Sequence, residues 1–106
     1  MAKSSFKELI VWQRAVDLVP HVYEVIARFP REEMFALSDQ IRRAVVSVPS
    51  NIAEGQARQY PKEFVQHLMI AKGSLAEVQT LMIVAERLKY VSTEQLARIE
   101  EEISAI

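Results

Sequence analysis

A line of polar side chains runs along one face of a predicted helix in the middle of the chain. From the first member, the polar positions follow at steps of three or four residues, which keeps them on one side of an α-helix. Amide, guanidinium, hydroxyl and carboxylate groups together offer many hydrogen-bond donors and acceptors. The line could therefore be a catalytic site or a structural polar seam between helices. Its members are Gln40, Arg43, Ser47, Asn51 and Glu54.

Catalysis by this line would require a group that titrates near neutral pH. The line contains none, unless burial raises the pKa of Glu54. A structural polar seam needs only matched donors and acceptors, and it could also satisfy the backbone groups that Pro49 leaves without a partner. The residue types therefore favour the structural interpretation.

A second candidate site lies near the N-terminus, where six residues separate Arg14 from His21. In a small all-helical protein this spacing is similar to that of the metal-independent ribonucleases of the HEPN class. In such a site arginine would steady a phosphate and histidine would move a proton. The same face carries Asp17, Glu24 and Arg28, so opposite charges alternate as on an ordinary exposed helix face. The exposed face explains all five residues, and the ribonuclease is the alternative function.

No pattern in the sequence predicts a metal site or a cofactor. The chain has no cysteine, which excludes disulfides and thiolate metal sites. His21 precedes Glu24, the reverse of the Glu-x-x-His order in di-iron bundles. No Gly-rich phosphate loop is present. We therefore expect a protein that is not an enzyme and that holds neither metal nor cofactor.

The apolar segments are too short to predict a membrane span. No apolar run approaches the roughly 20 residues that a bilayer requires, and no signal peptide is recognisable. We therefore expect a cytoplasmic protein without membrane contact.

The charge of the chain is unevenly distributed. The formal net charge is -1, but the stretch from Gln40 to Lys72 holds five basic residues against two acidic ones. This local surplus could be ordinary solvated surface, or it could neutralise phosphates. If nucleic acid is bound, we expect contacts from Arg42, Arg58, Lys62 and Lys72.

Hydrophobic periodicity predicts an all-α fold in a single domain over residues 1–106. Apolar residues recur at steps of three and four in four segments, and strand-like alternation is almost absent. Short connections place such helices in an antiparallel, up-down-up-down four-helix bundle. The first helix ends at Phe29, the second runs from about Glu32 to Arg58 with a kink at Pro49, the third begins at Pro61, and the fourth follows Ser92.

The first helix carries more apolar surface than its neighbours in one bundle would cover. One apolar line contains Trp12, Val16 and Tyr23, and a second line contains Leu18 and Val22. Identical subunits are the usual cover for such a surface. We therefore expect a homo-oligomer.

Three motifs spread over the chain resemble one family of helical proteins, which is encoded within 23S rRNA intervening sequences. The motifs are F-x-x-L-x-V-W-Q at Phe6 to Gln13, Q-I-R-R-A-x-x-S-x-P-x-N-I-A-E-G at Gln40 to Gly55, and I-A-K-G-S-L-A-E at Ile70 to Glu77. The central motif is long enough to be highly specific, and the resemblance covers essentially the whole chain.

This resemblance implies a small antiparallel bundle that assembles as a homopentamer and whose molecular function is unsettled. A related branch, the accessory variability protein of diversity-generating retroelements, resembles the chain in fold. That protein is a basic pentamer that binds the retroelement reverse transcriptase and nucleic acid. The expected function is accordingly a non-enzymatic oligomer that associates with RNA or with an RNA-handling partner protein.

Overall fold

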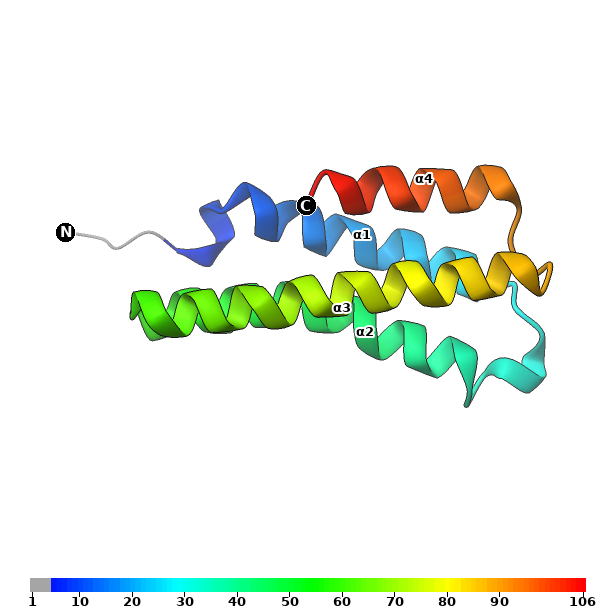
Figure 1. Ribbon diagram of the computed structural model, residues 1–106, viewed down its shortest axis with the longest axis horizontal. Coiled ribbons are helices and arrows are strands. Elements are labelled where there is room, and N and C mark those ends of the chain that lie inside the picture. Colours follow the sequence, from blue (N-terminus) through cyan, green and yellow to red (C-terminus); the bar gives the residue numbers. More distant parts are fainter. Residues whose placement is uncertain (1–4) are drawn as a thin grey trace.

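The chain folds into a bundle of four α-helices (Figure 1). The computed structural model describes residues 5–106, and no strand occurs among them. Consecutive α-helices run in opposite directions along the bundle (Figure 1). The all-α four-helix bundle expected from the sequence is therefore confirmed. The elements are the 3-10 helix η1 (Phe6–Glu8), α1 (Ile10–Ile26), the 3-10 helix η2 (Arg31–Glu33), α2 (Leu37–Arg58), α3 (Pro61–Arg87) and α4 (Thr93–Ser104).

The bundle is a rod of 51 × 23 × 17 Å in which the fourth helix is short. The 27 residues of α3 extend along most of the rod, whereas α4 has 12 residues. Figure 1 shows α4 ending about midway along the bundle, beside α1 and α3. One half of the rod is therefore built from four helices, and the other half mainly from three.

The fourth helix begins after Ser92, as the sequence predicted, and a capping box stabilises its N-terminus. The Ser92 side chain accepts a hydrogen bond from the backbone N–H of Gln95, and the Gln95 side chain accepts one from the backbone N–H of Ser92. This reciprocal capping box satisfies two backbone donors that a helix N-terminus otherwise leaves free.

The second helix begins later than the sequence predicted. It was expected from about Glu32, but α2 starts at Leu37. The intervening residues form tight turns, in which the Glu33 N–H donates to the Pro30 carbonyl at 2.9 Å and the Ala36 N–H donates to the Glu33 carbonyl at 3.0 Å. The Glu33 carboxylate also accepts from the Leu37 N–H at 3.4 Å. The acidic residue thus caps the start of α2 from outside and does not belong to its first turn.

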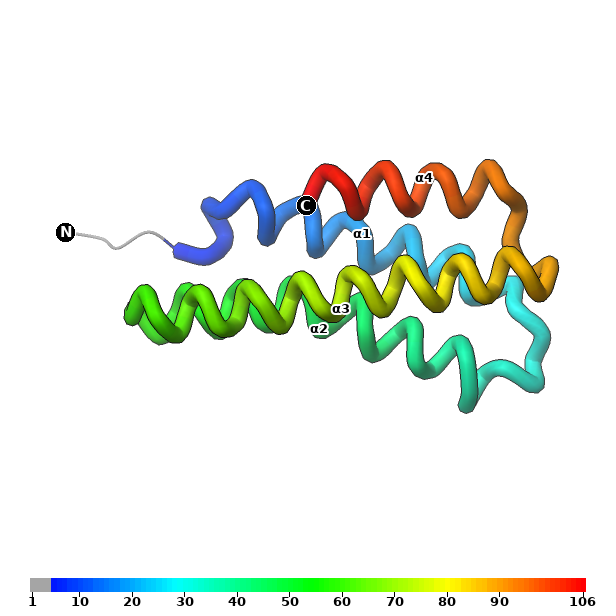
Figure 2. Tube along the Cα trace, viewed as in Figure 1, coloured from blue at the N-terminus to red at the C-terminus, as the bar shows by residue number. Residues whose placement is uncertain are grey.

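Pro49 lies inside α2 without ending the helix. Its ring provides no N–H for the helix ladder. Side chains next to it donate to neighbouring carbonyls: Ser50 Oγ donates to Val46 O, and Asn51 Nδ2 donates to Ser47 O, each at 2.9 Å. Figure 2 shows α2 following α3 along its second half and diverging from α3 along its first half. The proline leaves the Val45 carbonyl without its usual donor and bends the helix, and the two side chains bond the next carbonyls along the chain.

The two apolar lines of α1 have different environments. Leu18 and Val22, on one line, are fully buried, whereas Val16 and Tyr23, on the other, are exposed. The buried line packs with side chains of the other three helices. This larger core contains Leu18, Val22, Val25, Ile26, Phe29, Ile41, Ala44, Val45, Val78, Met82, Ala85, Val91, Leu96 and Ile99. A smaller cluster of Ala15, Val48, Ile52 and Ala71 fills the three-helix half.

Among the described residues, only α3 is long and apolar enough for a membrane span. Its best 18-residue window has a mean hydropathy of 1.4, and only 22% of that window is buried. Part of its apolar surface contributes to the core through Ala71, Val78 and Met82. Much of the rest faces outward, so α3 presents apolar surface that the bundle itself leaves uncovered.

A glycine sets the close approach of α2 to α3. A Cβ atom at Gly55 would lie 2.6 Å from His67 Cβ and 3.2 Å from the ring of Phe64. Gly55 is buried within α2, and both neighbours belong to α3. The contact therefore requires a residue without a side chain at this position.

Replacing Gly55 by alanine should destabilise the bundle. The new methyl group would lie 2.6 Å from His67 Cβ, and such overpacking costs about 1–3 kcal/mol. Gly73→Ala is the matched control, because nothing lies within 4 Å of a Cβ at Gly73. That control should gain about 0.5–1 kcal/mol from helix propensity. Thermal unfolding followed by circular dichroism measures both, and equal or higher stability of Gly55→Ala would contradict the close contact.

Candidate functional site

Hydrogen bonds between polar side chains join α2 to α3 near the middle of the bundle. Ser47 Oγ and Ser74 Oγ lie 2.8 Å apart. Asn51 Nδ2 donates to Ser47 O at 2.9 Å and to Ser47 Oγ at 3.1 Å. Asn51 Oδ1 lies 3.1 Å from His67 Nδ1. We call Ser47, Asn51, His67 and Ser74 the α2–α3 polar cluster.

The geometry of this cluster places a proton on His67 Nδ1. Asn51 Oδ1 can only accept a hydrogen bond, so His67 Nδ1 carries the proton that is donated to it. Asn51 thus accepts from α3 through its oxygen and donates within α2 through its nitrogen. All four residues of the α2–α3 polar cluster are half-buried. Their hydrogen bonds offset the free-energy cost of removing their polar groups from water.

The first two members of the polar line lie at the surface. The Arg43 side chain is 80% exposed, and its Nε donates to Asp39 Oδ2 at 3.0 Å within α2. Gln40 is also exposed. Of the five residues in the predicted polar seam, the structure therefore places Ser47 and Asn51 in hydrogen bonds associated with the α2–α3 contact, and Gln40 and Arg43 on the surface of α2.

Glu54, the last member of the line, belongs to an ion-pair group at the α2–α3 turn. Arg58 Nη2 donates to Glu54 Oε2 at 2.9 Å, and Arg58 Nη1 donates to Glu63 Oε1 at 3.2 Å. The hydrogen bond from Arg58, followed by the charge of His67, lowers the pKa of Glu54. A general acid or base at neutral pH would need a raised pKa, so this carboxylate lacks that property.

Arg14 and His21, the pair considered for RNA cleavage, connect α1 to the last helix. Arg14 Nη1 donates to the Ala105 carbonyl at 3.0 Å. His21 Nδ1 pairs with Glu102 Oε1. Both contacts reach residues at the end of α4, where they help to hold that helix against α1. This geometry gives the ribonuclease alternative no support.

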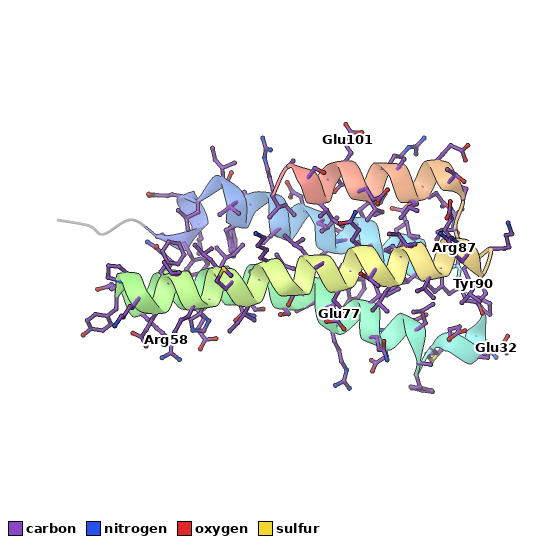
Figure 3. All side chains as sticks on the ribbon, in the orientation of Figure 1. Glu32, Arg58, Glu77, Arg87, Tyr90 and Glu101 are labelled. Carbon is purple, nitrogen blue, oxygen red and sulfur yellow. The ribbon has the colours of Figure 1, made fainter. Side chains whose placement is uncertain are left out.

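The four basic residues considered for nucleic-acid contact do not form one patch. Arg42 Nη2 donates to Met34 O at 2.7 Å, near the start of α2. Arg58 is held between two carboxylates at the far end of the same helix (Figure 3). Sixteen residues of helix separate them, about 24 Å along the axis. Lys62 and Lys72 are exposed on α3, and no ion pair involves either within residues 5–106.

The α3 half of the polar cluster was not predicted from the sequence. His67 and Ser74 are seven residues apart, which places them on one face of α3. This spacing could have indicated a polar face of α3 that contacts α2. The regular repeat of apolar residues at Leu68, Ala71 and Leu75 is the stronger pattern in the same helix. No three His, Cys, Asp or Glu side chains are grouped for a metal ion in the part of the chain that the structure describes.

The fold and the polar cluster define a small all-α bundle in which side-chain hydrogen bonds help to join two long helices. The family described as 23S rRNA-intervening sequence protein matches residues 7–106, and the chain belongs to that family. No curated protein matches the chain.

A solved structure of similar fold is known. It is a protein with unknown function from the S23 ribosomal protein family of Bacteroides thetaiotaomicron VPI-5482. The two folds agree with a TM-score of 0.80 over 91% of this chain and 90% of that chain, at 22% sequence identity. At this identity the likeness shows the fold alone.

Replacing Asn51 by alanine should lower stability, because His67 and Ser47 each lose a partner. Loss of a half-buried partner costs about 1–3 kcal/mol. Arg43→Ala is the matched control on the same helix and should stay within about 0.5 kcal/mol of wild type, since its ion pair is exposed. Urea unfolding at fixed protein concentration measures both variants. Unchanged stability of Asn51→Ala would return Asn51 to the possible active-site groups.

Proposed function

We propose that the chain is a non-enzymatic, homo-oligomeric helical scaffold that associates with RNA or with an RNA-handling partner protein. The subunit number that the family resemblance implies is five. The observation that carries this proposal is the apolar surface that the folded chain leaves uncovered on two different faces.

The first face is a groove along α1 and α2, of about 500 Å³. Val16 and Val46, on opposite sides of it, are 36% and 40% exposed. We call this the α1–α2 groove. Covering such side chains contributes about 25 cal/mol for each Å² of apolar surface removed from water. Its lining is Phe6, Trp12, Val16, Val19, Pro20, Val46, Pro49, Ser50 and Ala53.

The second face lies on α3. Val65 and Met69 are 58% and 62% exposed, and Ile70 beside them is 51% exposed. A ring of identical subunits joins two different surfaces, one from each neighbour. The α1–α2 groove and the outer face of α3 are two such surfaces on one subunit. Their presence therefore supports head-to-tail contacts between subunits, the kind of contact that a ring requires.

The polar contacts support a scaffold in preference to an enzyme. Asn51 and His67 bond to each other, and Glu54 pairs with Arg58. The histidine of the ribonuclease alternative, His21, pairs with Glu102. These groups contribute to helix–helix contacts or to surface ion pairs, the roles expected in a binding protein with a rigid frame.

Purified protein should have a mass of about five times the 12.1 kDa of one chain. Val46→Glu should shift the mass toward a monomer, because it places a charge in the α1–α2 groove. Gln40→Glu is the matched control, since it adds the same charge at an exposed site on the same helix outside that groove. Size-exclusion chromatography with light scattering measures all three proteins.

Two results would contradict assembly through this groove. A wild-type mass of 12.1 kDa at micromolar concentration would exclude a stable oligomer. An unchanged oligomer in Val46→Glu would exclude the α1–α2 groove as its interface.

RNA association should depend on the basic residues at the α2–α3 turn. A ring repeats the turn in every subunit, so several phosphates could be neutralised together. Replacing Arg58 and Lys62 together by alanine should weaken binding and reduce its dependence on salt. Replacing Arg87 and Lys89 together is the matched control, because it removes two exposed charges at the other end of α3.

Filter binding with a single-stranded RNA at two salt concentrations tests this part of the proposal. Wild-type binding should fall steeply as salt rises and show little sequence preference. Absence of retained RNA even at low salt would remove RNA from the proposed function. Equal losses in the two double variants would contradict a specific role for the α2–α3 turn.

A further inference from the structure

A cavity of about 300 Å³ lies at the connection between α1 and α2. Figure 1 shows this connection at one end of the rod, where the first half of α2 diverges from α3. We call it the Ser38 cavity. Its volume is at the lower end of the range for small-molecule sites, and it shares no lining residue with the α1–α2 groove. Its lining includes three apolar and three polar side chains, which are Ile26, Phe29, Pro30, Arg31, Ser38 and Arg42.

Ser38 brings a hydroxyl group without a partner to this cavity. The residue is 3% exposed and is the one buried polar residue within residues 5–106. No hydrogen bond involves its side chain in that part of the chain. Every side-chain nitrogen or oxygen atom that is sealed from solvent there has a partner, so the Ser38 Oγ is not sealed. Its small accessible area therefore includes the hydroxyl oxygen and opens into the cavity that the residue lines. Buried hydroxyl groups without a partner are uncommon in folded proteins, and a ligand that accepts this hydrogen bond would supply one.

Two arginine side chains give the cavity positive charge. Arg42 Nη2 donates to Met34 O at 2.7 Å and lies 3.8 Å from Asp39 Oδ1. The Arg42 side chain is only 29% exposed, so these contacts hold its guanidinium in place while its other N–H groups stay available. Arg31 is exposed, and neither a hydrogen bond nor an ion pair involves its side chain in the described part of the chain. Two guanidinium groups suit a ligand with several oxygen acceptors.

The start of α2 adds a favourable electrostatic field. The N–H of Gln40 is the first to bond a carbonyl one helical turn earlier. The N–H of Ser38 therefore lies outside the helical ladder, at the positive end of the helix dipole. The acidic residues nearby in the sequence, Glu32, Glu33 and Asp39, do not line the cavity. A negative charge is therefore favoured in the cavity, as it is at other helix N-termini that bind anions.

We propose that the Ser38 cavity binds a terminal phosphate group, that is, a phosphate monoester. The Ser38 hydroxyl and the guanidinium groups of Arg31 and Arg42 donate to its oxygens, and the carbon atoms next to the phosphate contact Ile26 and Phe29. The group is terminal because Ser38, at 3% exposure, lies too deep for a phosphate that continues in both directions along a strand. This proposal rests neither on ring assembly nor on RNA binding at the α2–α3 turn.

Isothermal titration calorimetry on the intact protein tests the site with inorganic phosphate and glycerol 3-phosphate. Both should bind saturably with a dissociation constant of about 1 mM or lower. Acetate should bind at least about tenfold more weakly, because it carries fewer oxygen acceptors and less charge.

Two RNA dinucleotides of one sequence, with and without a 5′-phosphate, separate the two sources of such a group. The dinucleotide without the phosphate should not enter the site. Tighter binding of the phosphorylated dinucleotide than of glycerol 3-phosphate would identify the end of an RNA as the source. Equal or weaker binding would identify a small phosphate ester.

Ser38→Ala should weaken the binding of inorganic phosphate about tenfold, because a hydrogen bond to a charged group is lost. Without phosphate it should unfold at the same temperature as wild type or at a higher one, since the hydroxyl has no partner in the protein to lose. A purely structural hydroxyl would lower that temperature. Ser50→Ala is the matched control, because it removes a hydroxyl from the same helix outside the cavity and should bind phosphate as wild type does.

A second pair of variants tests the charge. Arg31→Ala should weaken the binding of phosphate by about fivefold or more. Arg28→Ala removes an exposed arginine three residues earlier, outside the cavity, and should change binding less than about twofold.

Three results would overturn the proposal. The first is a dissociation constant above about 1 mM for both phosphate ligands, or equal affinity for acetate. The second is binding of phosphate to Ser38→Ala as tightly as to wild type. The third is equal weakening by Arg31→Ala and Arg28→Ala, which would mean that phosphate responds only to the charge of the surface.

Discussion

The close approach of α2 and α3 at Gly55 is the constraint on which the rest of the bundle depends. A side chain at this position would collide with His67, so a glycine allows the two longest helices to lie together. That approach places Asn51 within 3.1 Å of His67 Nδ1. About one turn after Gly55, Arg58 bonds Glu54 and also Glu63 at the start of α3. The hydrogen-bonded cluster and the ion-pair group therefore form on the scaffold that the glycine contact permits.

The sequence predicted the helices well, because hydrophobic periodicity and capping chemistry are local. The repeat of apolar residues along α3 and the capping box at Ser92 needed no knowledge of the other helices. The predicted start of α2 was wrong, because Glu33 lies in a preceding turn and its carboxylate accepts a hydrogen bond from the Leu37 N–H. The role of each residue in the polar line could also not be predicted without the positions of the other helices. Ser47 and Arg43 are both polar members of one face, yet only the position of α3 determines that Ser47 finds Ser74 while Arg43 lies in water.

Apolar surface and polar contacts together suggest how such a small chain functions. Many of the groups that could carry chemistry, Arg14 and His21 among them, bond other parts of the same bundle. The uncovered surface, in contrast, is apolar and lies on several sides, including the outer face of α3 and the edge of α1 around Val16. A rigid helical bundle with exposed apolar faces is suited to self-assembly and to the binding of partner molecules. Ser47 and Asn51 accordingly bond between or along helices, whereas Val16 and Val46 face outward.

The most direct test of this account is a double-mutant cycle on Asn51 and His67. Urea unfolding of wild type, Asn51→Ala, His67→Ala and the double variant, at one protein concentration, gives the coupling free energy between the two side chains. If the polar line helps to fasten α2 to α3, the coupling should lie between about 0.5 and 3 kcal/mol. A coupling near zero, with both single variants as stable as wild type, would contradict the account.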